Sequence, residues 1–134
     1  MWTIFQKLLL CSRVSFSALQ AILEGARRLY SKETILLLRG EKKKDFVKIS
    51  ELVVPQLATY GAGFANIPLY MLPMDFSIVG TVHSHPLGNL TPSATDLNRS
   101  FGVILMIVGF PYANERNAAV YNRNGEKLTL KVTK

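Results

Sequence analysis

The sequence predicts a single α/β domain, residues 1–134, in which a mixed β-sheet is flanked by helices. The chain has 134 residues with 49% hydrophobic content, which is enough to bury one core without disulfides. Apolar residues recur at helical spacing in one long segment and at strand spacing in several short ones. This mixture of the two periods in one short chain is typical of an α/β fold.

The first half of the chain contains an expected strand, a long helix and a hairpin. Residues 6–14 have the apolar character of a strand, and residues 15–30 place apolar side chains at helical spacing after serines that can cap a helix. Residues 34–39 and 46–54 flank the charged run 41–45. This pattern predicts a β-hairpin with a solvated turn.

The second half begins with an irregular segment and ends in a hairpin. Residues 55–77 mix glycine, proline and aromatic residues without a clear period, so most of this segment is expected to be loop. A strand, a short helix, a buried strand and a closing hairpin are expected at residues 78–83, 92–101, 103–110 and 118–132. Asn124 and Gly125 provide the turn of that hairpin.

Two histidines at the end of the expected strand 78–83 point to a metal. His83 and His85 are the only histidines of the chain, and their spacing in a strand directs both rings to the same face. Zinc binds neutral imidazole nitrogens, and a hydrolytic zinc typically has about three protein ligands with one position left for water. One further ligand is therefore needed.

Asp96 is the best candidate for that ligand. Thr91 followed by Pro92 is typical of an N-cap residue and the first position of a helix, so residues 93–96 are expected to form the opening turns of a helix. Ser93 and Asp96 then share one face, and a short loop rich in turn formers returns them to the strand end. The same pair also matches a capping box, in which it only satisfies backbone donors. The two histidines favour the metal site over that alternative.

A longer run around these residues matches a known family signature. The matching residues are Thr81-Val82-His83-Ser84-His85-Pro86 and Thr91-Pro92-Ser93-Ala94-Thr95-Asp96. They resemble the signature of the JAMM (MPN-plus) metalloproteases, which cleave bonds at the C-terminus of ubiquitin and ubiquitin-like modifiers. The resemblance implies a cytidine-deaminase-like MPN/JAMM fold and one zinc ion per chain, held by His83, His85 and Asp96. It also implies that Ser93 is a catalytic residue that stabilises the oxyanion.

A catalytic carboxylate is expected upstream of the histidines. The family has a glutamate at the start of a strand that follows the first long helix, and Glu33 matches that position. The family usually has a glycine three residues later, where this chain has Leu36, so the match depends on context. An attacking water must lose a proton and the departing amine must gain one, which a carboxylate beside the metal can provide. The alternative is an exposed charge at a strand edge.

The segment 55–77 is the expected substrate-facing element, because it immediately precedes the metal-bearing strand and is too irregular to be all core. Its candidate substrate-binding residues are Tyr60, Phe64, Tyr70 and Met71. A modifier tail ending in glycines would lie extended there and pair its backbone with a strand edge. The alternative is a lid over the core.

Composition limits which other functions and locations we expect for the protein. Basic residues gather between Arg27 and Lys48 and the net charge is +7, but no aromatic interleaving or nucleic-acid motif accompanies them, so we expect solubility and no nucleic-acid partner. Cys11 is the single cysteine and is expected to be a small core residue. The short apolar runs predict neither a signal peptide nor a membrane span, and hence a cytoplasmic protein.

These observations predict a zinc-dependent isopeptidase, a hydrolase that removes ubiquitin or a ubiquitin-like modifier from protein conjugates. Expected partners are the modifier, its conjugates, and a proteasome-like or other protein complex. Two alternatives share the fold, namely a processing protease for ubiquitin-fold sulfur-carrier proteins and a non-catalytic MPN scaffold. Scaffolds of this type typically lack ligands of the site, whereas this chain has every one.

Overall fold

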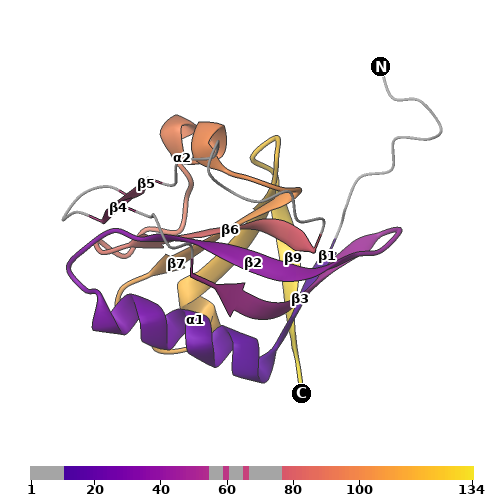
Figure 1. The fold of residues 1–134 in the computed structure, drawn as a ribbon, viewed down its shortest axis with the longest axis horizontal. Helices are drawn as coiled ribbons and strands as arrows, with labels where there is room; N and C mark the ends of the chain where they lie inside the picture. Colours follow the sequence, from indigo (N-terminus) through magenta and orange to yellow (C-terminus); the bar gives the residue numbers. More distant parts are fainter. Residues whose placement is uncertain (1–10, 55–58, 61–64, 67–76) are drawn as a thin grey trace.

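The computed structural model describes residues 11–54, 59–60, 65–66 and 77–134. Its elements are β1 (Cys11–Ser15), α1 (Phe16–Arg28), β2 (Ile35–Lys42), β3 (Phe46–Val53), β4 (Thr59–Tyr60), β5 (Ala65–Asn66), β6 (Ile78–His85), α2 (Ala94–Arg99), β7 (Ile104–Gly109), β8 (Ala118–Asn122) and β9 (Lys127–Thr133), with a 3-10 turn at Glu115–Asn117. Figure 1 shows α1 and α2 on opposite sides of the sheet. The predicted mixed sheet flanked by helices is confirmed.

The main sheet closes on itself in the order β1-β3-β2-β6-β7-β8-β9, with β9 paired back to β1. Strand β6 runs antiparallel to β2 and parallel to β7. It is buried on both faces from Val79 to His85, which explains why its sequence is a continuous apolar run without alternation before the histidines. His83 is paired with Ile35 of β2, and His85 with Gly109 of β7.

Helix α1 covers part of the core and leads the chain towards the start of β2. Ser15 caps it by accepting a hydrogen bond from the Ala18 backbone N–H at 3.1 Å. Its buried residues are Ala18, Leu19, Ile22, Leu23 and Ala26, and they belong to the main hydrophobic cluster together with residues of β2, β3, β6 and β7. Among the residues that the structure describes, no helix is long and apolar enough to cross a membrane.

The order of the predicted elements is confirmed, with local corrections. The predicted strand 34–39 extends through Gly40 to Lys42, because the sheet register shifts at a bulge between Arg39 and Gly40. At Gly40 a Cβ would lie 1.8 Å from the Lys48 carbonyl oxygen, so only glycine fits there. Cys11 is half-buried rather than in the core, since it begins β1. Residues 6–10 of the predicted first strand lie outside the described part of the chain.

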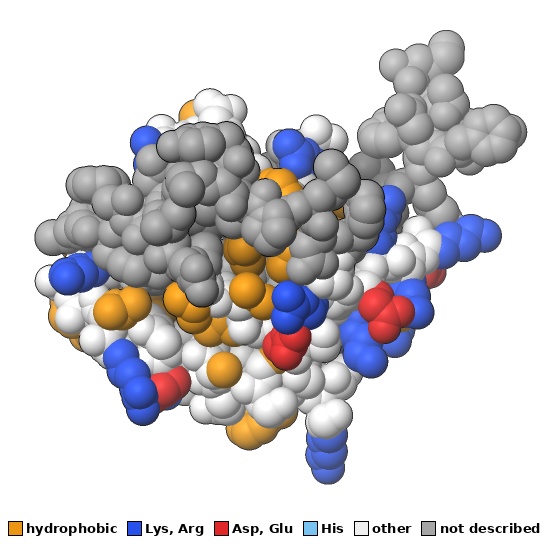
Figure 2. Space-filling view, in the orientation of Figure 1, with side chains coloured by type: hydrophobic (Ala, Val, Ile, Leu, Met, Phe, Trp, Pro, Cys, Tyr) orange, Lys and Arg blue, Asp and Glu red, His pale blue; other side chains and the backbone are white. Residues whose placement is uncertain are grey.

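Many of the basic side chains lie beside acidic ones. Figure 2 shows blue and red side chains adjacent to one another at several places on this face. Among the described residues, surface ion pairs include Arg27–Glu24, Arg28–Glu24, Arg39–Glu51 and Lys43–Glu41. Exposed pairs of this kind contribute about 0–1 kcal/mol each to stability.

Gly109 lets the loop that follows β6 approach β7. A Cβ at Gly109 would lie 2.6 Å from the Gly88 carbonyl oxygen, well inside van der Waals contact. We therefore expect Gly109→Ala to displace this loop and to lower the free energy of unfolding by about 1–3 kcal/mol, measured by denaturant titration. The matched control is Gly25→Ala in α1, where the new Cβ meets Leu52 Cδ2 at 3.9 Å. That change should stabilise the protein by about 0.5–1 kcal/mol, and a similar loss in both variants would contradict the prediction.

Candidate metal and catalytic site

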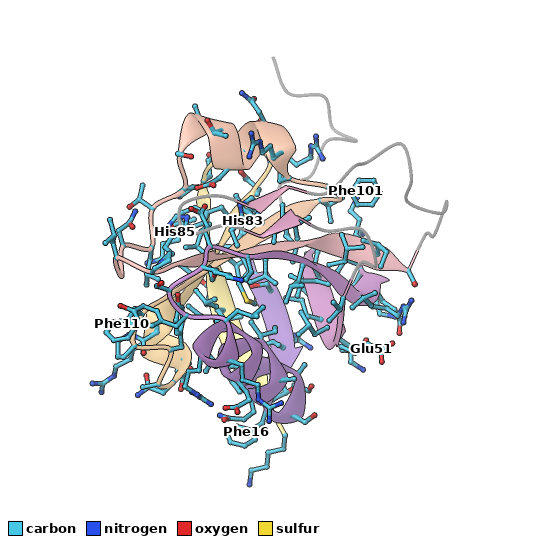
Figure 3. The ribbon with its side chains drawn as sticks, turned by 60° about the vertical axis from the view of Figure 1, so that its left-hand side comes forward. Phe16, Glu51, His83, His85, Phe101 and Phe110 are labelled. Atoms are coloured by element: carbon cyan, nitrogen blue, oxygen red, sulfur yellow. The ribbon has the colours of Figure 1, made fainter. Side chains whose placement is uncertain are left out.

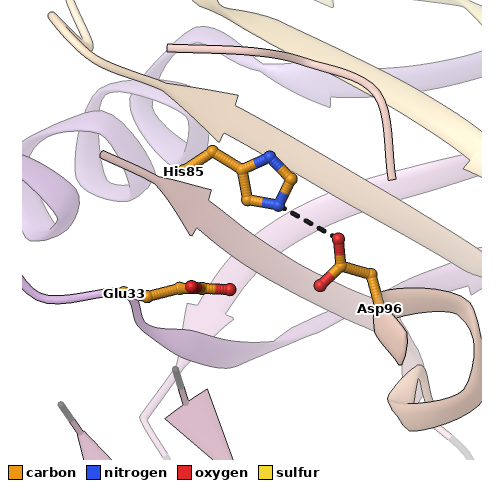
Figure 4. Close-up of side chains that lie close together, drawn as sticks. All are labelled: Glu33, His85 and Asp96. Atoms are coloured by element: carbon orange, nitrogen blue, oxygen red, sulfur yellow. Dashed lines mark hydrogen bonds and ion pairs between the residues drawn. The ribbon is translucent and has the colours of Figure 1, made fainter. Parts of the chain in front are cut away.

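The start of β2, the end of β6 and the start of α2 meet around one cavity of about 780 Å³. All five residues that the sequence predicts as metal-binding or catalytic line it, namely Glu33, His83, His85, Ser93 and Asp96. Figure 3 shows His83 and His85 side by side, below helix α2. In Figure 4 the side chains of Glu33, His85 and Asp96 point towards a common centre.

The carboxylate of Asp96 bridges the two histidines. Its Oδ1 lies 3.2 Å from His83 Nδ1, and its Oδ2 lies 3.1 Å from His85 Nε2. Burial opposes ionisation of Asp96, but hydrogen bonds from His83, His85 and the Ser93 backbone outweigh it and hold the pKa of this carboxyl well below its usual range. Asp96 is therefore an ionised carboxylate, the form that binds a metal.

A backbone carbonyl fixes the orientation of the His85 ring. His85 Nδ1 lies 3.0 Å from the carbonyl oxygen of Asn89, which can only accept, so Nδ1 carries a proton and donates it. Nε2 then faces Asp96: it donates to the carboxylate when the ring is charged and presents its lone pair when the ring is neutral. Burial opposes a charged ring, but the hydrogen bond and the charge of Asp96 raise the pKa of His85. The position between Nε2 and the carboxylate thus favours a cation, and a carbonyl behind the ring is typical of metal-binding histidines.

His83 carries an unpaired nitrogen. Its Nε2 is buried and has no hydrogen-bond partner among the residues that the structure describes. Such a buried polar atom costs about 1–3 kcal/mol, which a metal bond would remove. Ligand atoms of Glu33, His85 and Asp96 also lie within 4.8 Å of one another. That group has one imidazole and two carboxylates and does not include His83, so it differs from the predicted ligand set of His83, His85 and Asp96. Imidazole nitrogens and carboxylate oxygens are donors that zinc binds, so the residues fit a zinc ion.

Glu33 is held against the histidine strand by the residue that follows it. The Thr34 backbone N–H donates to Ser84 Oγ at 2.8 Å, the two hydroxyl oxygens are 2.9 Å apart, and the Ser84 backbone N–H donates to the Thr34 carbonyl at 3.0 Å. Because Ser84 lies between His83 and His85, these bonds set the position of Glu33 relative to both rings. Burial raises the pKa of the Glu33 carboxyl, which suits a group that takes and returns a proton.

Removal of the Ser84 hydroxyl should therefore affect catalysis as well as stability. In Ser84→Ala the buried Thr34 N–H loses its partner, so we expect a loss of about 1–3 kcal/mol in unfolding free energy. Displacement of Glu33 should also lower kcat by about 10–100-fold with little change in KM, and Ser84→Thr should restore it. The control is Ser12→Ala, which removes a buried hydroxyl on β1, separated from β6 by β3 and β2. Ser12→Ala should lower stability alone, and an equal loss of kcat in both variants would refute the prediction.

Ser93, and not Thr91, caps helix α2. Ser93 Oγ accepts from the Asp96 N–H at 3.0 Å, and Asp96 Oδ2 accepts from the Ser93 N–H at 2.8 Å, which is the capping box. Such a box needs a hydroxyl three residues before the carboxylate, and Thr91 is too far upstream. The helix is therefore Ala94–Arg99, shorter than the predicted 92–101. The two alternatives are not exclusive, because Asp96 both closes the box and contacts the histidines.

The predicted substrate contacts are not tested by the structure. Phe64, Tyr70 and Met71 lie outside the described residues, and only the backbone of Tyr60 is described, in β4. Several residues that line the cavity carry no catalytic or ligand signal in the sequence, including Tyr30, Leu87, Asn89 and Arg99. Leu87 and Asn89 lie between His85 and Asp96 in the sequence, and this position could have indicated that they lie near the site. Tyr30 follows α1, and no local pattern connects it to the histidines.

Comparison with known proteins agrees with this geometry. Residues 16–121 match the family model described as prokaryotic homologs of the JAB domain. The chain belongs to the JAB family. Its domain is thus of the JAB/MPN metalloprotease-like type, and the predicted family and fold are both confirmed.

Three related proteins match this chain over most of its length. A protein of Haloferax volcanii named "probable metalloprotease" is 32% identical over 129 residues, which is 89% of this chain and 78% of that protein. A JAB1/MPN domain protein from Archaeoglobus fulgidus is 33% identical with a TM-score of 0.68, covering 91% of this chain and 99% of that one. A solved structure described as "JAMM: A Metalloprotease-like Zinc Site in the Proteasome and Signalosome" is 34% identical with a TM-score of 0.64, over 94% and 99% of the two chains.

Proposed function

We propose that this chain is a zinc-dependent isopeptidase that cleaves ubiquitin or a ubiquitin-like modifier from protein conjugates. The observation that carries the proposal is the meeting of Glu33, His83, His85 and Asp96 in one cavity, where the buried His83 Nε2 has no partner among the described residues. The name of the Haloferax volcanii relative and the metalloprotease-like zinc site for which the third relative is described support the same chemistry.

His83, His85 and Asp96 would hold one zinc ion, with Glu33 beside them. Zinc bound there supplies a Lewis acid and lowers the pKa of a water ligand to ~7. Glu33 takes a proton from the attacking water and returns it to the departing amine, a task for which its raised pKa is suited. The Ser93 hydroxyl can donate while it accepts from Asp96 N–H, so it holds the oxygen on which negative charge develops.

The choice of a modifier as substrate is supported by the family to which the chain belongs. Conjugates of such modifiers are joined through a C-terminal glycine to a lysine or to another chain. That linkage is an amide, which a water activated at this site would hydrolyse. Glycines next to the amide carry no side chains, so the scissile carbonyl can approach the buried groups of the cavity.

The test is cleavage of a panel of modifier fusions by the purified protein, with chelator, and with chelator followed by zinc. The panel contains ubiquitin-like and sulfur-carrier modifiers ending in Gly-Gly, each joined to a lysine or to a peptide. We expect cleavage after the terminal glycine, loss with chelator, recovery with zinc, and about one zinc per chain by elemental analysis. Bound zinc without cleavage of any fusion would identify a scaffold, and cleavage that resists chelation would refute a metalloprotease.

A further inference from the structure

The mouth of the cavity carries apolar side chains that are exposed to solvent. Tyr30, Leu87 and Phe110 are 50%, 96% and 46% exposed, and we call these three residues the apolar rim. Among the described residues only two further large hydrophobic side chains are exposed, Phe16 and Val54. Exposed apolar side chains that gather beside a cavity mark a binding surface more often than scattered ones do.

Two of the three rim residues, Tyr30 and Phe110, are held together by ring stacking. The rings of Tyr30 and Phe110 are stacked with centroids 4.6 Å apart and planes at 29°, and Phe110 meets the buried Tyr112 edge-on at 6.1 Å. Such aromatic pairs contribute attraction beyond the burial of area, and they restrict the rotamers of the rings involved. The stacked pair of Tyr30 and Phe110 is therefore the preorganised part of the rim, which lowers the entropic cost of binding there.

The rim is also joined to the metal strand through the backbone. The carbonyl oxygen of His85 accepts hydrogen bonds from the Gly88 N–H at 3.0 Å and from the Phe110 N–H at 3.2 Å. Leu87 precedes Gly88, so these bonds hold the backbone of the turn that carries Leu87 close to the backbone of Phe110. Figure 3 shows Phe110 on the same side of the molecule as His85, whereas Phe16 lies at the far end of α1.

The rim continues directly into the site. Tyr30 and Leu87 line the same cavity as Glu33 and His85. A polypeptide whose scissile carbonyl lies between these two groups must leave the cavity across its mouth. An extended chain advances about 3.3 Å per residue, so a chain that leaves on the side of Tyr30 and Leu87 brings a side chain to the rim within a few residues of the cleaved bond.

We propose that the apolar rim binds a leucine or phenylalanine side chain of the substrate polypeptide, a few residues from the cleaved bond, and so contributes to specificity. This proposal rests on the proposed function. The occupant is chosen by apolar chemistry, because an acidic or hydroxylic side chain placed against Leu87 and Phe110 would lose water without a hydrogen bond from either of them in return.

The test measures binding without cleavage, in the zinc-loaded Glu33→Gln protein. The probes are fluorescent extended hexapeptides ending in Gly-Gly, isopeptide-linked to lysine, with leucine, serine or aspartate at each of the other positions in turn. We expect one position at which leucine lowers Kd by about tenfold relative to serine. Leu87→Ser and Phe110→Ser should reduce this preference below about threefold, while the control Phe16→Ser leaves it unchanged. Leu87 is 96% exposed, so its replacement does not threaten folding.

Equal binding of all peptides, no binding of any, or an intact preference in both rim variants would overturn the proposal. It would also be overturned if sedimentation showed a dimer that Leu87→Ser dissociates, since the occupant would then be a second copy of the chain. Failure of the proposed function gives a different result. Selective peptide binding without any cleavage by zinc-loaded wild-type protein rejects the isopeptidase alone, whereas cleavage without side-chain preference rejects the rim alone.

Discussion

Replacement of Glu33 by glutamine is expected to lower kcat by about 10²–10⁴-fold while the zinc content stays near that of the wild-type protein. Glutamine has the shape of glutamate but cannot take a proton from water or return one to an amine. The Glu33 side chain is half-buried and lines the cavity, and burial raises the pKa of its carboxyl. Turnover of a cleaved modifier fusion and elemental analysis of zinc measure the two effects separately.

The same variant decides between two roles for Glu33. Its carboxylate lies with His85 and Asp96 in a group whose ligand atoms are within 4.8 Å of one another, so Glu33 is itself a conceivable ligand. Loss of zinc from Glu33→Gln would show that it binds the metal, and unaltered turnover would exclude both roles. The matched control is Glu51→Gln, which removes an exposed carboxylate that pairs with Arg39 on the surface. Figure 3 shows Glu51 well away from the histidines, and its loss should affect neither measurement.

The sequence made the histidine strand and its carboxylate predictable because their signals are local. His83 and His85 are two positions apart, so a strand alone is enough to place both rings on one face. The helix that brings Asp96 back to them is encoded within the next few residues. Ser93 and Thr91 are both good N-cap residues, so local preference could not separate them. The reciprocal hydrogen bonds between Ser93 and Asp96 decide for Ser93.

Other parts of the site depend on contacts between distant segments. The hydrogen bond from Thr34 to Ser84 joins residues 50 positions apart. The Tyr30–Phe110 stack joins the segment that follows α1 to the segment that follows β7. No periodic pattern or motif in the sequence predicts either of these two contacts. The continuation of β2 through Gly40 was likewise hidden, because glycine in a short apolar run predicts an end as readily as a bulge.

Substitutions of Asp96 should have the second large effect, and they separate the cap from the ligand. In Asp96→Ala the capping box and both histidine contacts disappear, so we expect loss of zinc, loss of turnover, and a drop of about 1–3 kcal/mol in the unfolding free energy of the metal-free protein. In Asp96→Asn one amide oxygen can still accept from the Ser93 N–H. The neutral amide is nevertheless a poor ligand for zinc, which takes carboxylate oxygens.

The two variants should therefore differ in stability and agree in metal content. Asp96→Asn should keep most of the thermal stability measured in chelator, yet lose zinc and turnover as completely as Asp96→Ala. The control Asp45→Asn changes an exposed carboxylate between β2 and β3 and should alter none of the three measurements. If Asp96→Asn retained zinc and turnover, Asp96 would serve as a helix cap alone. The zinc would then be held without Asp96, and the ligand set of His83, His85 and Asp96 would have to be abandoned.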